Sequence, residues 1–191
     1  MEELFQKAKS FVRDHKKQFS IGVPVVIVVV VGLVMWSLYS YNHQQPKIMY
    51  EPANACDLVT MDKAKTLLGD KTINGVNQTP VQQGDVTISK CGYSDGLPDV
   101  SNAVVAAISV RSAINDDGIK INKAQFESGK PTGVQDVTGI GDEAYFNAGL
   151  GQLNVFKETT WIIVSYGSAA NPKDNTLEDS EKLAKLALNA Q

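Results

Sequence analysis

The feature that most constrains this chain is an uncharged apolar run near the N-terminus, residues 21–39, with the sequence IGVPVVIVVVVGLVMWSLY. As a helix with a rise of about 1.5 Å per residue, the run would extend roughly 28 Å, close to the roughly 30 Å hydrocarbon thickness of a bilayer. A buried helix of a soluble protein and a cleaved signal peptide are the alternatives. Signal peptides usually have a shorter apolar core that ends in small residues, whereas this run leads into Trp36, Tyr39 and Tyr41. We therefore predict a retained transmembrane helix over residues 21–40.

The charges on either side of this run predict its orientation. Five Lys and Arg residues precede it, and none follows it before Lys47, so the positive-inside rule places the N-terminus in the cytoplasm. We predict a cytoplasmic basic amphipathic tail (1–20), the transmembrane helix, a polar stalk (41–54) and an extracytoplasmic domain (55–191), with the bilayer as a partner. Beyond residue 20 the chain has thirteen basic and eighteen acidic residues, a net charge of −5. This acidic balance argues against nucleic acid as a partner.

The chain has two cysteines, Cys56 and Cys91, and both lie in the predicted extracytoplasmic domain. Cys56 follows small residues and precedes an aspartate, which is compatible with a lipid anchor, a metal ligand, a nucleophile or a disulfide. Sixteen residues separate Tyr39 from Cys56, too many for a lipidated cysteine that directly follows an apolar segment. The two histidines, His15 and His43, lie outside the domain, so a zinc site and a histidine-activated thiol are both disfavoured. We predict a Cys56–Cys91 disulfide.

Residue periodicity predicts the order of helices and strands in this domain. Helical spacing of apolar residues occurs at 60–69, 122–129 and 176–191, and strand patterns occur at 85–94, 103–111, 152–158 and 159–167. The segment AINDDGIK (113–120) resembles a calcium loop, but alanine occupies the first and last aligned ligand positions, so we predict a turn. Short connections between neighbouring strands predict an α+β fold, with helices packed on a mainly antiparallel sheet.

Three motifs carry a resemblance to a known family. They are CDLVTMDKAKTLLG, a second cysteine in CGYS, and GIGDEAYF followed by LNVFKETTWIIVSY. Their order over residues 54–190 resembles actinobacterial envelope domains of unknown function, which open with Cys-Asp-Leu-Leu and close with a Gly-x-Gly-Asp-Glu-Ala strand. Those domains are mostly lipoproteins, so a transmembrane anchor is a departure here. The resemblance implies a PsbP-like α/β sandwich and supplies no established catalytic residues.

The predicted domain lacks the motifs of common enzyme classes. It has no histidine, no Ser-x-x-Lys, no Gly-x-Ser-x-Gly, no HExxH and no P-loop. Residues 139–144 match a dinucleotide fingerprint formally, but two carboxylates would face the pyrophosphate and no helix follows, so we predict a turn into a strand.

We therefore expect no enzyme activity, no cofactor and no metal. The expected function is the binding of an envelope component, either a small ligand or a lipid. The alternative is an accessory subunit that docks on another membrane protein. The candidate binding surface consists of Asp142, Glu143, Tyr145, Phe146 and Trp161.

Overall fold

The structure is a computed structural model that describes residues 30–37, 47–99 and 101–189. The chain divides into two units, Met1–Gln45 and Pro46–Gln191. The predicted tail and most of the predicted transmembrane helix lie outside the described residues, and residues 30–37 are helical with exposed side chains. Within the described residues, no helix is both long enough and apolar enough to span a bilayer. The remaining description concerns the folded domain from residue 47 onward.

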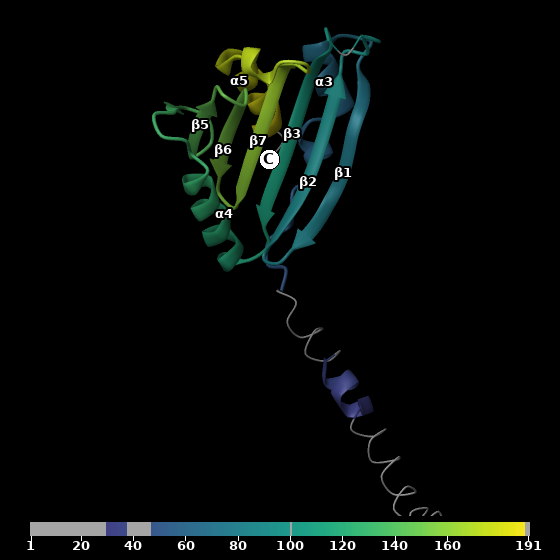
Figure 1. Cartoon of the computed structure of the whole chain (residues 1–191), viewed down its shortest axis with the longest axis vertical. Helices are drawn as coiled ribbons and strands as arrows, with labels where there is room; N and C mark the ends of the chain where they lie inside the picture. Colours follow the sequence, from purple (N-terminus) through teal and green to yellow (C-terminus); the bar gives the residue numbers. More distant parts are fainter. Residues whose placement is uncertain (1–29, 38–46, 100, 190–191) are drawn as a thin grey trace, which may run out of the picture. The chain divides into compact units, whose positions relative to one another are not determined.

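Within the described residues, seven strands form one antiparallel sheet in the order β1-β2-β3-β7-β6-β5-β4 (Figure 1). The strands are β1 Ile73–Gln83, β2 Val86–Ser94, β3 Val104–Ala113, β4 Gln135–Val137, β5 Glu143–Asn147, β6 Gln152–Lys157 and β7 Thr160–Ser168. The α+β prediction with a mainly antiparallel sheet is confirmed. The predicted β6–β7 hairpin is also confirmed, with Lys157 opposite Thr160.

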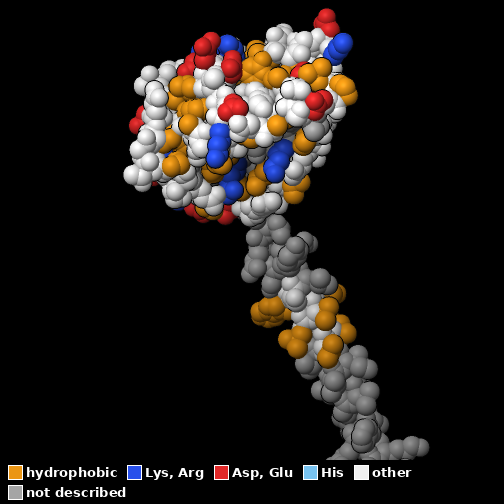
Figure 2. Space-filling view, turned by 45° about the horizontal axis from the view of Figure 1, so that its top comes forward, with side chains coloured by type: hydrophobic (Ala, Val, Ile, Leu, Met, Phe, Trp, Pro, Cys, Tyr) orange, Lys and Arg blue, Asp and Glu red, His pale blue; other side chains and the backbone are white. Residues whose placement is uncertain are grey.

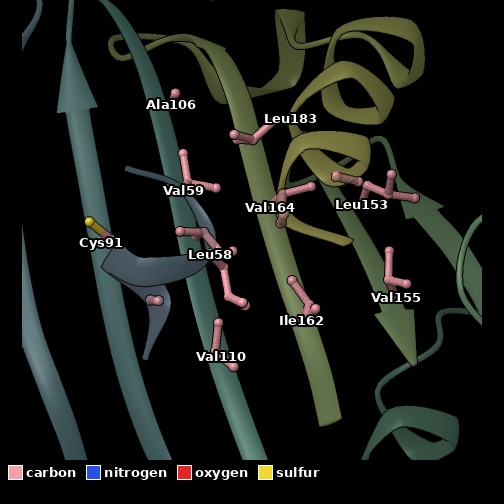
Figure 3. Close-up of a cluster of buried hydrophobic side chains, with 14 of the residues drawn as sticks. Leu58, Val59, Cys91, Ala106, Val110, Leu153, Val155, Ile162, Val164 and Leu183 are labelled. Carbon is pink, nitrogen blue, oxygen red and sulfur yellow. The ribbon is translucent and has the colours of Figure 1, made fainter. Parts of the chain in front are cut away.

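One face of this sheet carries the main hydrophobic core. Ile108, Val110 and Val164 alternate with half-exposed residues along the central strands β3 and β7, and each is at most 3% exposed. The short helix α2 (Ala55–Leu58), α3 (Met61–Leu68) and α5 (Leu177–Leu188) pack on this face. Figure 3 shows Leu58 and Val59 near α2, and Leu183 on α5, lying against the strands. A 3-10 turn, η1 (Pro172–Asp174), leads into α5.

The predicted helices α3 and α5 are confirmed, together with their end signals. Thr60 caps α3 by accepting a hydrogen bond from the backbone N–H of Lys63, and Gly69 follows the helix with φ of 88°. Leu183, Ala184 and Ala187 are buried on the inner face of α5, while Lys185 pairs with Glu181 at 3.0 Å on its outer surface. An apolar stripe and capping residues thus specified both helices.

The predicted turn at 113–120 is wrong, because α4 (Asp116–Ser128) begins there. Asn115 is the cap, and its side chain accepts a hydrogen bond from the N–H of Gly118. Glycine fits at position 118 of the helix, whereas the Cβ of any other residue would overlap the carbonyl oxygen of Asp85. Asn122, the first residue of the predicted helix 122–129, lies inside α4 and is fully buried. Its side-chain amide donates to the carbonyl oxygens of Arg111 and Thr159.

Helix α4 packs on the sheet face opposite α2, α3 and α5. Its residue Phe126 forms a second, smaller core with Tyr145 of β5 and Phe156 of β6. The ring centroids of Phe126 and Tyr145 are 5.0 Å apart, and those of Phe126 and Phe156 are 5.7 Å apart. Figure 1 shows α4 beside the lower ends of β6 and β7, so it covers only one end of this face.

The Cys56–Cys91 disulfide predicted from the sequence is present and joins α2 to β2, with the two Cα atoms 5.1 Å apart. Neighbouring hydrogen bonds hold the same segment. Ser89 Oγ accepts from the N–H of Ala55 and donates to the carbonyl oxygen of Ala53. Residues 49–53, assigned above to the stalk, also bond to the domain, because the N–H of Met49 donates to the carbonyl oxygen of Ile114 and that of Ala53 to Ser112 Oγ.

We expect Cys56→Ser to lower the free energy of unfolding by about 3.5–4 kcal/mol, because the disulfide closes a loop with a sequence separation of 35 residues. Urea denaturation of the full chain in detergent micelles measures this loss. Reduced wild-type protein is the control and should unfold at the same urea concentration as the variant. A wild-type transition that is unchanged by reductant would contradict the stabilising role of the disulfide.

We expect Gly118→Ala to destabilise the domain by about 1–3 kcal/mol, because the added methyl group needs a backbone shift at Asp85. This sign is opposite to the usual gain of about 0.8–1 kcal/mol for alanine over glycine in a helix. Gln125→Ala, on the exposed side of the same helix, is the matched control and should change stability by less than about 0.5 kcal/mol. A Gly118→Ala variant that is more stable than the wild type would show that the close contact between residue 118 and the Asp85 carbonyl does not exclude a side chain.

Candidate functional site

The segment Gly139-Ile140-Gly141-Asp142 forms the turn that leads into β5. Gly139 and Gly141 have φ values of 79° and 63°, which glycine adopts without a steric penalty. The N–H of Asp142 donates to the carbonyl oxygen of Phe156 at 2.8 Å, and Asp142 Oδ2 accepts from the N–H of Glu158 at 2.6 Å. The turn is therefore fastened to the β6–β7 hairpin, and Asp142 is part of that attachment.

A pocket of about 480 Å³ lies between this turn, the C-terminal end of α4 and the short edge strand β4. Its floor includes the aromatic residues Phe126 and Tyr145, which are 3% and 2% exposed. The remaining lining residues are Glu127, Lys130, Asp136, Val137, Thr138, Gly139, Ile140, Gly141, Asp142, Glu143 and Ala144. The pocket thus combines an apolar floor with a charged rim.

The rim contains four carboxylates and one lysine, so its own charge is negative. Lys130 pairs with Asp136 across the pocket edge. Lys123 of α4 pairs with Glu143, and its Nζ lies 3.7 Å from Glu127 Oε1. These pairs are partly exposed, so each contributes at most about 1 kcal/mol to stability.

The aromatic floor is rigid and largely neutral. Lys123 Nζ lies 5.1 Å from the ring centroid of Phe156, within the range of a cation–π contact. Trp161 packs on Phe126 in an edge-on arrangement, with the ring centroids 6.2 Å apart. Burial raises the pKa of Tyr145 above its ordinary value, so this phenol stays protonated at neutral pH. Tyr145 thus provides a ring surface and a hydrogen-bonding hydroxyl, and no basic phenolate.

The structure brings together three of the five candidate residues. Asp142, Glu143 and Tyr145 line the pocket. Phe146 follows Tyr145 in β5 and therefore points to the opposite face, where it packs against the main core. Trp161 is half-buried behind Phe126 and is not a lining residue.

The sequence reasoning missed the part of the pocket contributed by α4 and by the segment that follows it. Phe126, Glu127, Lys130 and Asp136 approach the turn only in the folded chain. Phe126 lies in α4 and Lys130 lies just beyond its end, and no local signal placed this part of the chain against β5.

Among the described residues, no group of three or more His, Cys, Asp and Glu side chains is arranged to hold a metal ion. No protein-family model, curated protein or solved structure matches this chain. The candidate site is therefore defined by its own geometry.

We expect Gly141→Ala to destabilise the domain more than Gly139→Ala. Both residues have positive φ, a conformation that costs a non-glycine residue roughly 1–2 kcal/mol. A Cβ at Gly141 would in addition lie 2.5 Å from Val155 Cγ1, whereas a Cβ at Gly139 has no neighbour within 4 Å. Thermal unfolding of the two variants measures the difference, and equal losses would show that packing against β6 does not matter at the turn.

Proposed function

We propose that this protein is a membrane-anchored binding protein whose extracytoplasmic domain holds a small envelope ligand in the pocket beside the Gly139–Asp142 turn. The observation that carries the proposal is the pocket itself. Its volume of about 480 Å³ falls in the range of roughly 300–1,000 Å³ that is typical of small-molecule sites. Its apolar floor and converging polar rim are also typical of such sites.

The charge of the rim suggests the chemistry of the ligand. Four carboxylates and one lysine line the pocket, above the rings of Phe126 and Tyr145. A ligand with an apolar part and a cationic or hydrogen-bond-donating group would complement both regions. Because Lys123, Lys130 and Lys157 form ion pairs with these carboxylates, the preference for such a ligand over an anionic one is modest.

A binding role fits the rim better than catalysis. Asp142 accepts a hydrogen bond from the N–H of Glu158. Glu143 pairs with Lys123, and Asp136 pairs with Lys130. Each of these carboxylates already has a structural contact, which makes it a poorer candidate for a general base. We therefore propose a non-enzymatic function.

The location is the second part of the proposal. It is supported by the apolar run at residues 21–39, by the excess of Lys and Arg before that run, and by the Cys56–Cys91 disulfide. The resemblance of three sequence motifs to envelope domains is also in accord with it. The orientation predicts that a reporter enzyme that works only outside the cytoplasm will be active when it is fused after Gln191. An inactive fusion at normal expression would contradict the orientation.

We expect Thr138→Trp to abolish retention of the ligand, because this exposed lining residue can place an indole in the pocket without disturbing the core. Native mass spectrometry of the full chain, purified from its own membranes, detects the bound molecule. Thr132→Trp adds the same exposed indole outside the pocket and should retain the ligand.

Equal retention by both tryptophan variants would place the ligand elsewhere. Wild-type protein that carries no small molecule, even after incubation with an extract of its own envelope, would contradict the proposal.

A further inference from the structure

The sheet face that carries α4 is covered only at one end. Figure 1 looks onto this face, with β1, β2, β3 and the upper part of β7 uncovered by a helix. We call this uncovered surface the open face. Cross-strand pairing places Ile88 beside Arg111, and Val76 opposite Gly92. The side chains used below are Val76, Ile88, Lys90, Ala107, Arg111 and Ile163.

The charge of the open face differs from that of the rest of the domain. The four strands β1, β2, β3 and β7 contain two charged residues. Lys90 lies on the open face, and Arg111 lies at its border with α4, where it bonds Asn122. Ile88 pairs with Arg111 and Lys90 pairs with Ser109, so the two cations are diagonal neighbours, about 7–8 Å apart at the backbone. In Figure 2, Lys and Arg side chains lie among hydrophobic ones on the visible face.

Neither cation has an acidic partner within the part of the chain that the structure describes. Arg111 donates from Nε to the neutral side chain of Asn122 at 2.8 Å, and burial lowers the pKa of its guanidinium. A half-buried guanidinium without a carboxylate is poorly compensated. An anionic group placed on this face would therefore gain a desolvated partner as well as the exposed ammonium of Lys90.

The open face is also apolar. Val76 on β1 is 49% exposed, and Ile88 and Ile163 are half-exposed beside small residues such as Ala107. Addition of another strand along the edge of β1 is hindered, because Pro80 lacks an N–H and the β1–β2 register shifts twice. A partner protein therefore gains more binding free energy by packing on the open face than by adding a strand beside β1.

The dimensions of the open face suit a helix. Ten residues of β3 extend about 33 Å, of which α4 covers the lower end (Figure 1), and four strands spaced about 4.8 Å apart are roughly 14 Å wide between the outer axes. A helix of about 12 residues is about 18 Å long and about 10–12 Å wide, which fits the uncovered part. Helix α4 already covers one end of this face in the same layered manner.

We propose that the open face docks an amphipathic, acidic helix of a partner protein. The apolar stripe of that helix covers the valine and isoleucine side chains, and its carboxylates pair with Lys90 and Arg111. This surface is separate from the pocket, so the proposal goes beyond the function proposed above and does not rest on it.

Two other occupants fit the charges less well. An anionic membrane surface is usually bound by clusters of four to eight basic residues, and this face offers two in a domain whose net charge is negative. A second copy packed through the same face would bring Lys90 and Arg111 toward their own counterparts, which is repulsive.

The test uses the full chain in detergent micelles and a fluorescein-labelled amphipathic peptide of about 12 residues, with leucines on one face flanked by glutamates. Fluorescence anisotropy should show saturable binding of this peptide and much weaker binding of an otherwise identical peptide that carries lysines. A photoreactive residue at the centre of the acidic peptide should crosslink to β1, β2, β3 or β7.

Lys90→Glu should weaken binding of the acidic peptide by about tenfold. Lys65→Glu makes the same charge change on the exposed side of α3 and should alter binding by less than about twofold. Arg111→Gln should also weaken binding, and circular dichroism checks its folding because Arg111 contacts Asn122. Thr138→Trp, which fills the pocket, should bind normally, so failure of one proposal is distinguishable from failure of the other.

Three outcomes would overturn the docking proposal. The first is equal binding of the acidic and basic peptides, and the second is an equal effect of Lys65→Glu and Lys90→Glu. The third is binding of vesicles that contain anionic phospholipid in place of the acidic peptide, with the same dependence on Lys90, which would assign the open face to a membrane surface.

Discussion

The burial of one face along the middle of β3 and β7 is the constraint on which the rest of the structure depends. Val110 and Val164 are fully buried beneath α2 and α5, and each such side chain contributes about 1.5–3 kcal/mol to stability. Because side chains alternate along a strand, the intervening residues must lie on the other face. There α4 covers one end, which creates the pocket beside β5, and leaves the open face with Lys90 and, at its border, Arg111. Both candidate binding surfaces thus follow from how one side of the sheet is filled.

Much of the fold could be predicted because the periodic segments coincide with buried faces. β3, β7, α3 and α5 show alternation or an apolar stripe, and capping residues mark the helix ends. β1 was not predicted, because it is mostly exposed and has no apolar alternation. The start of α4 was read as a turn because Asp-Asp-Gly is typical of turns. The contact that requires Gly118, with the Asp85 carbonyl, is remote in sequence.

The candidate site was predictable only where its residues are contiguous. Asp142, Glu143 and Tyr145 follow one turn and lie together, whereas Phe146 points away because adjacent strand residues face opposite sides. That separation could have been deduced from alternation alone. The contribution of α4 could not, because it depends on Phe126 packing between Tyr145 and Phe156. Arg111 was equally inconspicuous, since its lack of an acidic partner is a property of the folded sheet.

We propose that the domain works outside the cytoplasm, because a disulfide such as Cys56–Cys91 persists in an oxidising compartment. The redox state of these two cysteines in intact cells tests this directly. Cells are treated with a membrane-permeant alkylating reagent before lysis, and the tryptic peptides are analysed by mass spectrometry without reduction. The account predicts one linked peptide that contains Cys56 and Cys91, with neither cysteine alkylated. Recovery of both cysteines as alkylated thiols would contradict the extracytoplasmic location and, with it, binding at the envelope.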